Sequence, residues 1–137
     1  MRPVLLDTGV IVALLDRSER QHQTCVSIVK ALTQPLVTCE AVVAESCYLV
    51  REMPSAADAI LENVEKQIFQ VPFSVARSAS AVRRILRRYR DQNIDLADAC
   101  LIRLAEEVET GEILTLDADF RVFRWRRNRP FELLIPL

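Results

Sequence analysis

The sequence has very little glycine and histidine. Its only glycines are Gly9 and Gly111, and its only histidine is His22. Loops that cradle nucleotide phosphates need several closely spaced glycines, so dinucleotide-binding and Walker-type sites are excluded. A Ser-His-Asp triad would depend on His22, which lies in a polar stretch and is expected to face solvent. Serine-hydrolase chemistry is therefore disfavoured.

Cysteine pairs and long apolar runs are also missing. No two of the four cysteines have the C-x-x-C spacing of a zinc site or redox pair. Each lies in an apolar run, which predicts buried free thiols in a reducing compartment. No stretch approaches the ~20 apolar residues of a membrane span, and Asp7 interrupts the apolar N-terminal stretch, unlike a signal peptide. We therefore expect a cytoplasmic protein with no membrane partner.

The charged residues are unevenly distributed along a chain whose formal net charge is only -1. Residues 74–90 contain six arginines and no acid, residues 91–119 contain nine acids and one arginine, and residues 121–129 contain five arginines and no acid. An arginine-rich helix is most often a solvated face, and contact with nucleic-acid phosphates is the alternative. The predicted phosphate-binding residues of the second basic segment, which also carries a tryptophan, are Arg124, Arg126 and Arg127.

Apolar strands alternate with amphipathic helices along the whole chain. Helix N-caps are expected at Thr8, Ser18, Ser74 and Asp95, and Gly111 is expected to end the helix that follows Asp95. The expected strands are 3–7, 36–38, 68–73, 113–116 and 133–135. The expected helices are 9–15, 19–34, 40–52, 55–67, 75–90, 96–109 and 119–126. This alternation predicts one α/β domain over residues 1–137 with a parallel sheet.

Two of the expected apolar strands end in an aspartate, Asp7 and Asp117. If both strands are parallel and central, both carboxylates emerge at the same edge of the sheet, where open α/β folds build their ligand sites. Asp98 lies on the first turn of the helix capped by Asp95, and Glu45 lies among apolar residues of another helix. Taken singly, each acid has an ordinary structural role as a cap, a helix-dipole partner or a solvated side chain.

A cluster of acids without a nearby histidine or cysteine has one clear chemical use. Carboxylates are the hard oxygen ligands that Mg²⁺ and Mn²⁺ prefer. Two such ions can activate water and stabilise the leaving oxygen of a phosphodiester. The acids therefore favour metal-dependent phosphodiester hydrolysis, and the candidates for such a cluster are Asp7, Glu45, Asp98 and Asp117. Their assignment as the catalytic metal ligands is what the family resemblance below implies.

Four segments resemble the PIN-domain family, and in particular its small VapC-like toxins. Leu5–Gly9 is similar to the family's opening strand, whose aspartate is the first metal ligand. Val43–Glu45 is similar to the helix that carries the family's glutamate, and Asp95–Leu101 is similar to its central Asp-Ala helix start. Leu114–Phe120 is similar to its Thr-x-Asp-x-Asp-Phe segment. The resemblance extends over residues 3 to about 135 in the family's order.

This resemblance implies a three-layer α/β/α sandwich around the parallel sheet, and endoribonuclease activity that depends on Mg²⁺ or Mn²⁺. It implies RNA as the substrate, contacted by the basic segment at residues 121–129, and in many members a homodimer. Toxins of this type are encoded beside an antitoxin that blocks the site. Auxiliary groups, which are hydroxyls that orient ligands and further acids, are Thr8, Thr115, Asp95 and Asp119.

Two other functions stay open from the sequence alone. The Asp117–Asp119 segment also fits the Asp-x-Asp of an aspartyl phosphotransferase, but such sites usually hold the phosphoryl group with a lysine. Lys30 and Lys66 are both expected on amphipathic helices away from strand ends. A PIN-like domain can also be a non-catalytic RNA-binding or scaffold module. Trapping of an aspartyl-phosphate would identify the first alternative, and loss of carboxylate-dependent Mn²⁺ binding would identify the second.

Overall fold

The computed structural model describes all residues, Met1–Leu137, and contains a five-stranded sheet in the order β3-β2-β1-β4-β7. All neighbouring strands are parallel, and β1 is central, with Leu5 paired to Val37 on one side and to Ile113 on the other. Every residue of β1 is fully buried, as expected for a parallel strand covered on both faces. The strands are β1 Val4–Leu6, β2 Leu36–Val37, β3 Phe69–Gln70, β4 Glu112–Leu114 and β7 Glu132–Leu133.

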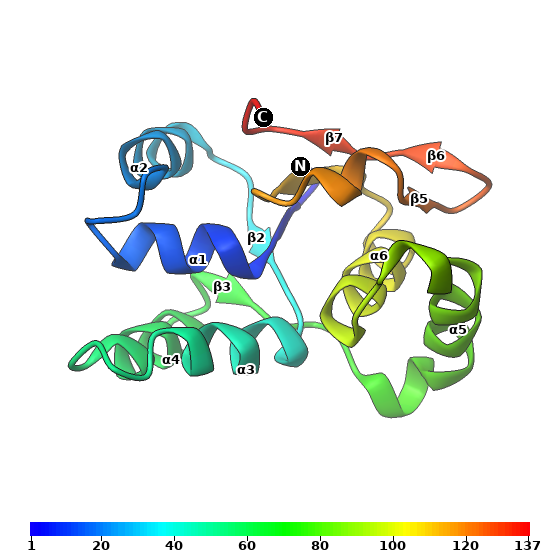
Figure 1. The fold of residues 1–137 in the computed structure, drawn as a ribbon, viewed down its shortest axis with the longest axis horizontal. Helices are drawn as coiled ribbons and strands as arrows, with labels where there is room; N and C mark the ends of the chain where they lie inside the picture. Colours follow the sequence, from blue (N-terminus) through cyan, green and yellow to red (C-terminus); the bar gives the residue numbers. More distant parts are fainter.

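Helices cover the sheet on both sides. Figure 1 shows α1 and α2 on one side of the sheet, α5 and α6 on the other, and α3 and α4 beside the β2–β3 edge. The predicted α/β/α fold is therefore confirmed. The α-helices are α1 Thr8–Leu15, α2 His22–Ala31, α3 Glu40–Leu49, α4 Ala56–Glu65, α5 Val75–Arg88 and α6 Leu96–Val108. Two short 3-10 turns are η1 Arg90–Gln92 and η2 Ala118–Arg121.

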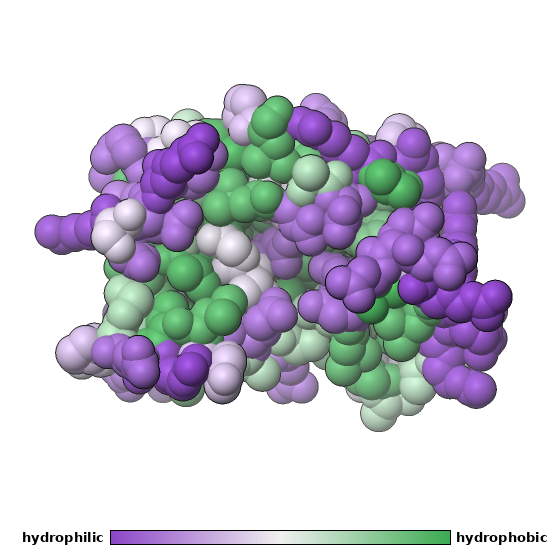
Figure 2. Space-filling view, viewed as in Figure 1, coloured by the Kyte–Doolittle hydropathy of each residue, from purple (hydrophilic) through white to green (hydrophobic).

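The surface in this view is divided by polarity. In Figure 2, hydrophilic side chains predominate at the right over α5, and apolar side chains are visible between α1 and α4. No helix combines the length and apolar character needed to cross a membrane. The four cysteines are free thiols, and all except Cys47 are buried, as predicted.

Two of the four predicted helix caps are correct. Ser74 and Asp95 each accept a hydrogen bond from the backbone N–H three residues ahead, at the starts of α5 and α6. The cap of α1 differs from the prediction. Its N-cap is Asp7 rather than Thr8, because the Asp7 carboxylate accepts the Thr8 N–H and the helix begins one residue earlier than expected.

The turn between α1 and α2 also differs from its prediction. The Ser18 hydroxyl donates to the Asp16 carboxylate at 2.6 Å instead of capping a helix, and α2 begins only at His22. His22 is half-buried, and its Nδ1 lies 2.6 Å from the carbonyl oxygen of Ala13 in α1. The expectation that His22 faces solvent is therefore wrong, because its ring ties this turn to α1.

The end of α6 depends on a contact that is distant in sequence. Glu109, rather than Gly111, ends the helix, in a left-handed conformation with φ of 56°. Gly111 is needed for space, because a Cβ there would lie 2.4 Å from Nε1 of Trp125. Trp125 belongs to a two-stranded hairpin formed by β5 Arg124–Trp125 and β6 Arg129–Pro130. The helix expected over residues 119–126 is therefore present only as the short turn η2, and the helix prediction for residues 122–126 is wrong.

Candidate active site

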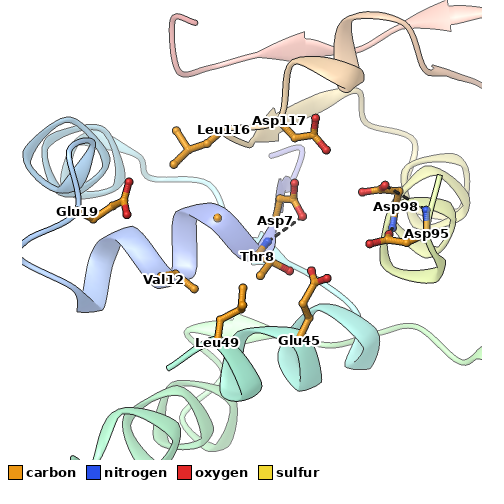
Figure 3. A pocket seen from close by; sticks show the side chains of 11 residues that line it. Asp7, Thr8, Val12, Glu19, Glu45, Leu49, Asp95, Asp98, Leu116 and Asp117 are labelled. Atoms are coloured by element: carbon orange, nitrogen blue, oxygen red, sulfur yellow. Dashed lines mark hydrogen bonds between the residues drawn. The ribbon is translucent and has the colours of Figure 1, made fainter. Parts of the chain in front are cut away.

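A pocket of about 340 Å³ opens at the carboxyl ends of β1 and β4. Figure 3 shows that its acidic side chains come from the start of α1, from the turn between α1 and α2, from α3, from the start of α6 and from the loop after β4. The structure thus brings the four predicted metal ligands into one pocket. No lysine or arginine lines it. Its acidic residues are Asp7, Glu45, Asp95, Asp98, Asp117 and, on the far side, Glu19.

Asp7 is held in one orientation by three hydrogen bonds. Its N–H donates to the Leu114 carbonyl at 3.0 Å, its Oδ1 accepts the Thr8 N–H at 2.8 Å, and its Oδ2 accepts the Thr115 hydroxyl at 2.7 Å. Only 6% of its surface is exposed. Burial raises the pKa of Asp7 from its ordinary 3.8 to about 6, and the hydrogen bonds from Thr115 and Thr8 oppose this rise.

Thr115 connects the ends of the two central strands. Its fully buried hydroxyl donates to Asp7 and accepts the Asp117 N–H at 3.0 Å. The Asp117 carboxylate accepts the Asp119 N–H at 2.9 Å, at the start of η2. Asp119 is exposed, and neither it nor Thr115 lines the pocket. Both residues therefore influence the site through the carboxylates that they hold.

Asp95 and Asp98 form a reciprocal cap at the N-terminus of α6. Asp95 Oδ1 accepts the Asp98 N–H at 2.8 Å, and Asp98 Oδ2 accepts the Asp95 N–H at 3.4 Å. Burial raises the pKa of Asp98 to about 8, and the negative charges of Asp95 and Asp7 contribute to this rise. A helix N-terminus favours anions, but here it does not offset burial and the neighbouring carboxylates.

Glu45 and Thr8 bring oxygen atoms without partners to the pocket. Glu45 is half-buried on α3, and its carboxylate makes no hydrogen bond or ion pair within the chain. Thr8 is 5% exposed, and its Oγ1 has no hydrogen-bond partner. Buried hydroxyl groups are rarely left without a partner, so the Thr8 hydroxyl is an unsatisfied polar group at the wall of the pocket.

The donor set fits a hard divalent cation such as Mg²⁺ or Mn²⁺. Carboxylate and hydroxyl oxygens are the ligands that these ions prefer. A cation would also compensate the negative charges that contribute to the raised pKa values of Asp7 and Asp98. The side chains do not form a preformed centre, because no three acidic, histidine or cysteine side chains are grouped closely enough to hold one ion. The structure therefore supplies suitable ligand types in one pocket without fixing their coordination.

Glu19 and the apolar part of the pocket were not predicted from the sequence. Glu19 lies in the turn between α1 and α2, and Val12, Leu49 and Leu116 provide the apolar lining. Nothing in the sequence marks Glu19, because acidic residues are common in exposed turns. Leu116 did have a signal, since it immediately precedes a predicted ligand and therefore lies at the same edge of the sheet.

The arginines predicted to bind nucleic acid lie outside the pocket. The Arg124 guanidinium donates to the carbonyls of residues 121, 122 and 123 at 2.8, 3.2 and 3.0 Å. Arg126 forms an ion pair with Glu109 at 2.7 Å. Arg127 is exposed and has no side-chain partner. Arg124 and Arg126 therefore stabilise the C-terminal hairpin, and Arg127 is the one of the three whose guanidinium group is free.

This chain is similar to known proteins in both sequence and structure. Residues 4–125 match the family model of the PIN domain. The chain is 32% identical over 116 residues to ribonuclease VapC26 of Mycobacterium tuberculosis, covering 83% of this chain and 86% of that protein. Its structure is similar to that of M. tuberculosis VapC20, a toxin that cleaves the sarcin-ricin loop, with a TM-score of 0.81, 19% identity, and coverage of 93% of this chain and 99% of VapC20. The chain therefore belongs to the PIN-domain family.

Proposed function

We propose that this protein is a Mg²⁺- or Mn²⁺-dependent endoribonuclease that acts as the toxin of a toxin–antitoxin pair. The observation that carries the proposal is one pocket lined by six carboxylates from five separate chain segments and by no cationic side chain. The relatives support the substrate class, because VapC26 is a ribonuclease and VapC20 is a toxin that cleaves the sarcin-ricin loop. RNA is therefore the proposed substrate.

In this proposal Asp7, Glu45, Asp98 and Asp117 would hold the metal, which would supply a bound water of lowered pKa and a positive charge beside the scissile phosphate. The hydrogen bonds to both carboxylate oxygens of Asp7 hold this side chain in the orientation proposed for metal binding. Without a cation the same carboxylates repel a phosphodiester, so the pocket accepts RNA only when its charge is compensated.

Four further residues have auxiliary roles. Thr115 positions Asp7 through its hydroxyl, and Asp95 positions Asp98 through the reciprocal cap. The remaining two are Asp119 and Thr8. The Asp119 N–H holds the Asp117 carboxylate from outside the pocket, and Thr8 lines the pocket with a buried hydroxyl that has no partner within the chain.

An aspartyl phosphotransferase is a weaker alternative, because the pocket has no lysine to hold a phosphoryl group. Lys66 pairs with Glu62 on α4 at 3.5 Å, and Lys30 lies on α2, away from the pocket. A non-catalytic scaffold is also weaker, because all four carboxylates of the predicted metal site are present and line the pocket.

The proposed setting is the cytoplasm, with an antitoxin that blocks the pocket and a second copy of the chain as a dimer partner. An apolar hollow between α3 and α6, lined by three alanines and Leu96, adjoins Glu45 and Asp95 and suits a protein contact. Leu96 is 47% exposed there. Light scattering on the purified chain measures whether this surface supports a homodimer.

The proposal is tested by cleavage of a structured RNA pool in Mg²⁺ or Mn²⁺. Asp7→Asn and Asp98→Asn each remove one ligand charge and keep the side-chain shape, so we expect each to lower cleavage by about 100-fold while the protein stays folded. Asp58→Asn is the matched control, because it makes the same change on the exposed surface of α4, outside the pocket. Equal cleavage by the wild type and both pocket variants would contradict the assignment.

A further inference from the structure

The active-site pocket has a second part that the proposed metal chemistry does not use. In Figure 3, Glu19 lies on the opposite side of the pocket from Asp98, and the apolar side chains of Val12 and Leu116 lie between Glu19 and Asp7. The pocket thus continues from the carboxylates into an apolar region with a single acid at its far end. We call this part the Glu19 subsite, and its residues are Gly9, Val12, Glu19, Leu49 and Leu116.

Gly9 lies close to Leu116. A Cβ at Gly9 would lie 3.5 Å from the Cβ of Leu116, an ordinary van der Waals distance, so the glycine leaves the space of one methyl group beside that leucine. Leu49 is 55% exposed despite being apolar, and Val12 and Leu116 are half-buried. A flat, weakly polar ring that enters this space would cover exposed apolar surface, which is favourable in water.

The backbone of Glu19 is fixed, while its carboxylate is free. Its N–H donates to the Asp16 carbonyl at 3.0 Å, and its carbonyl accepts the His22 N–H at 2.9 Å. The His22 ring in turn holds the Ala13 carbonyl of α1. The Glu19 carboxylate has no hydrogen bond or ion pair within the chain, although Arg17 and Arg20 are its near neighbours in sequence. The turn therefore presents an unpaired acceptor at the end of the apolar region.

We propose that the Glu19 subsite binds an unpaired guanine of the RNA substrate beside the cleaved bond, an inference that rests on the proposed ribonuclease function. A carboxylate only accepts hydrogen bonds, and it does so through two adjacent oxygens. Guanine is the one RNA base whose Watson–Crick edge offers two adjacent donors, N1–H and the N2 amino group. Adenine and cytosine place an acceptor beside their amino group, and uracil places its N–H between two carbonyls, so each of them directs a lone pair at Glu19.

Replacing Glu19 by glutamine distinguishes base recognition from a purely structural role of this side chain. Glu19→Gln replaces one acceptor oxygen by an NH₂ donor, and this donor–acceptor pair can form two hydrogen bonds with the Watson–Crick edge of any of the four bases. The substitution leaves the backbone hydrogen bonds of the turn in place, and the side chain is exposed, so the fold is retained. The preference for guanine should therefore be lost while the protein stays folded.

The first experiment measures binding without metal or cleavage. Nitrogen-15-labelled protein in EDTA is titrated with each of the four ribonucleosides, which carry no phosphate for the carboxylates to repel, and followed by NMR. In the wild type, guanosine should shift the backbone amides of Gly9, Val12 and Glu19 and bind about tenfold more tightly than adenosine. Glu19→Gln should remove this preference, and Glu65→Gln, the same change on the exposed surface of α4, should keep it. Equal binding of the four nucleosides by the wild type, or absence of shifts at these amides, would overturn the proposal.

The second experiment maps cleavage positions in random-sequence RNA with Mn²⁺. The wild type and Glu65→Gln should show guanine enriched about tenfold at one fixed position beside the cut, and Glu19→Gln should cleave without this enrichment. Cleavage by the wild type without any base preference would overturn the guanine subsite and leave the ribonuclease proposal standing. Absence of cleavage by the wild type would contradict the ribonuclease proposal, and the NMR titration would then decide the subsite alone.

Discussion

Thr115 holds two pocket residues with one buried hydroxyl, which donates to the Asp7 carboxylate and accepts the Asp117 N–H. Thr115→Val keeps the shape of the side chain and leaves both partners unsatisfied. Hydrogen bonds to charged groups contribute about 1.5–3 kcal/mol, so we expect the free energy of unfolding to fall by about 2 kcal/mol in urea titrations. The pKa of Asp7 should also rise further, because the Thr115 hydrogen bond lowers it.

The matched control is Thr115→Ser, which keeps the hydroxyl and removes only a methyl group. It should retain most of the stability and the Asp7 pKa of the wild type. If the valine and serine variants unfolded at the same urea concentration, the hydroxyl would not have the role that its two hydrogen bonds indicate.

The raised pKa values of Asp7 and Asp98 predict how the metal-free protein responds to pH. A raised carboxyl pKa means that the folded protein holds the proton more tightly than the unfolded chain, so unfolding releases protons and stability falls as pH rises. The stability contributed by Asp7 is lost between pH 3.8 and about 6, and that contributed by Asp98 is lost between pH 3.8 and about 8. The shift at Asp7 corresponds to roughly 3 kcal/mol at most.

Urea unfolding in EDTA at pH 5, 6.5 and 8 measures this dependence. The lowered pKa values of Asp16 and Glu109 act only at lower pH, so they do not interfere in this range. We expect stability to decrease from pH 5 to pH 8, and Asp98→Asn to remove the decrease above pH 6.5. Constant or rising stability across this range would contradict the like-charge account of the pocket.

At the residue scale, the sequence predicted the charged groups of the site but not the groups around them. Asp7 and Asp117 were recognisable because each follows a short apolar strand. The unpartnered hydroxyl of Thr8 depends on packing, and no sequence pattern reports it. His22 was misassigned for the same reason, since its polar sequence neighbours gave no sign of its bond to α1.

At the scale of elements, predictions succeeded where the pattern is local and failed where a distant contact decides the conformation. The capped starts of α5 and α6 follow from single residues, Ser74 and Asp95. The C-terminal hairpin instead depends on Trp125, which packs against Gly111 and donates to the Pro130 carbonyl. The turn of the hairpin also has positive φ angles at residues 126–128. Two arginines and an asparagine do not predict this conformation.

The two basic elements differ in how their arginines are bonded, and this predicts different effects of mutation. On α5, Arg83 and Arg87 lie one helical turn apart and without a side-chain partner, and hydrophilic side chains cover this part of the surface in Figure 2. In the hairpin, Arg124 and Arg126 are bonded within the chain. We therefore expect α5 to contribute phosphate contacts and these two hairpin arginines to contribute stability.

The measurement is RNA affinity as a function of salt concentration. Arg83→Gln with Arg87→Gln should lower the slope of log K against log salt by about 1.4, because each phosphate of a single strand that an arginine neutralises contributes about 0.7 to that slope. Arg124→Gln with Arg126→Gln should lower the melting temperature and leave the slope nearly unchanged. The reverse pattern would place the phosphate-binding arginines in the hairpin, as the sequence first indicated.

At the scale of the whole molecule, the order of the strands in the sheet brings the residues of the site together. β1 and β4 are neighbours in the sheet although most of the chain separates them, and this brings Asp7 beside Thr115 and Asp117. The alternation of strands and helices was sufficient to predict a common edge for the two strand-end acids. Glu19 and the apolar lining were beyond that reasoning, because they reach the pocket through the packing of a turn and of α3.

The most direct test of the central claim, that these carboxylates form one divalent-cation site, is a calorimetric Mn²⁺ titration at pH 7. The wild type should bind Mn²⁺ saturably and release protons, because the pKa of Asp98 near 8 leaves this group largely protonated until the ion binds. Asp98→Asn should bind about tenfold more weakly and release fewer protons, and Asp58→Asn should match the wild type. Equal Mn²⁺ affinity for all three proteins, or no binding by the wild type, would contradict the account.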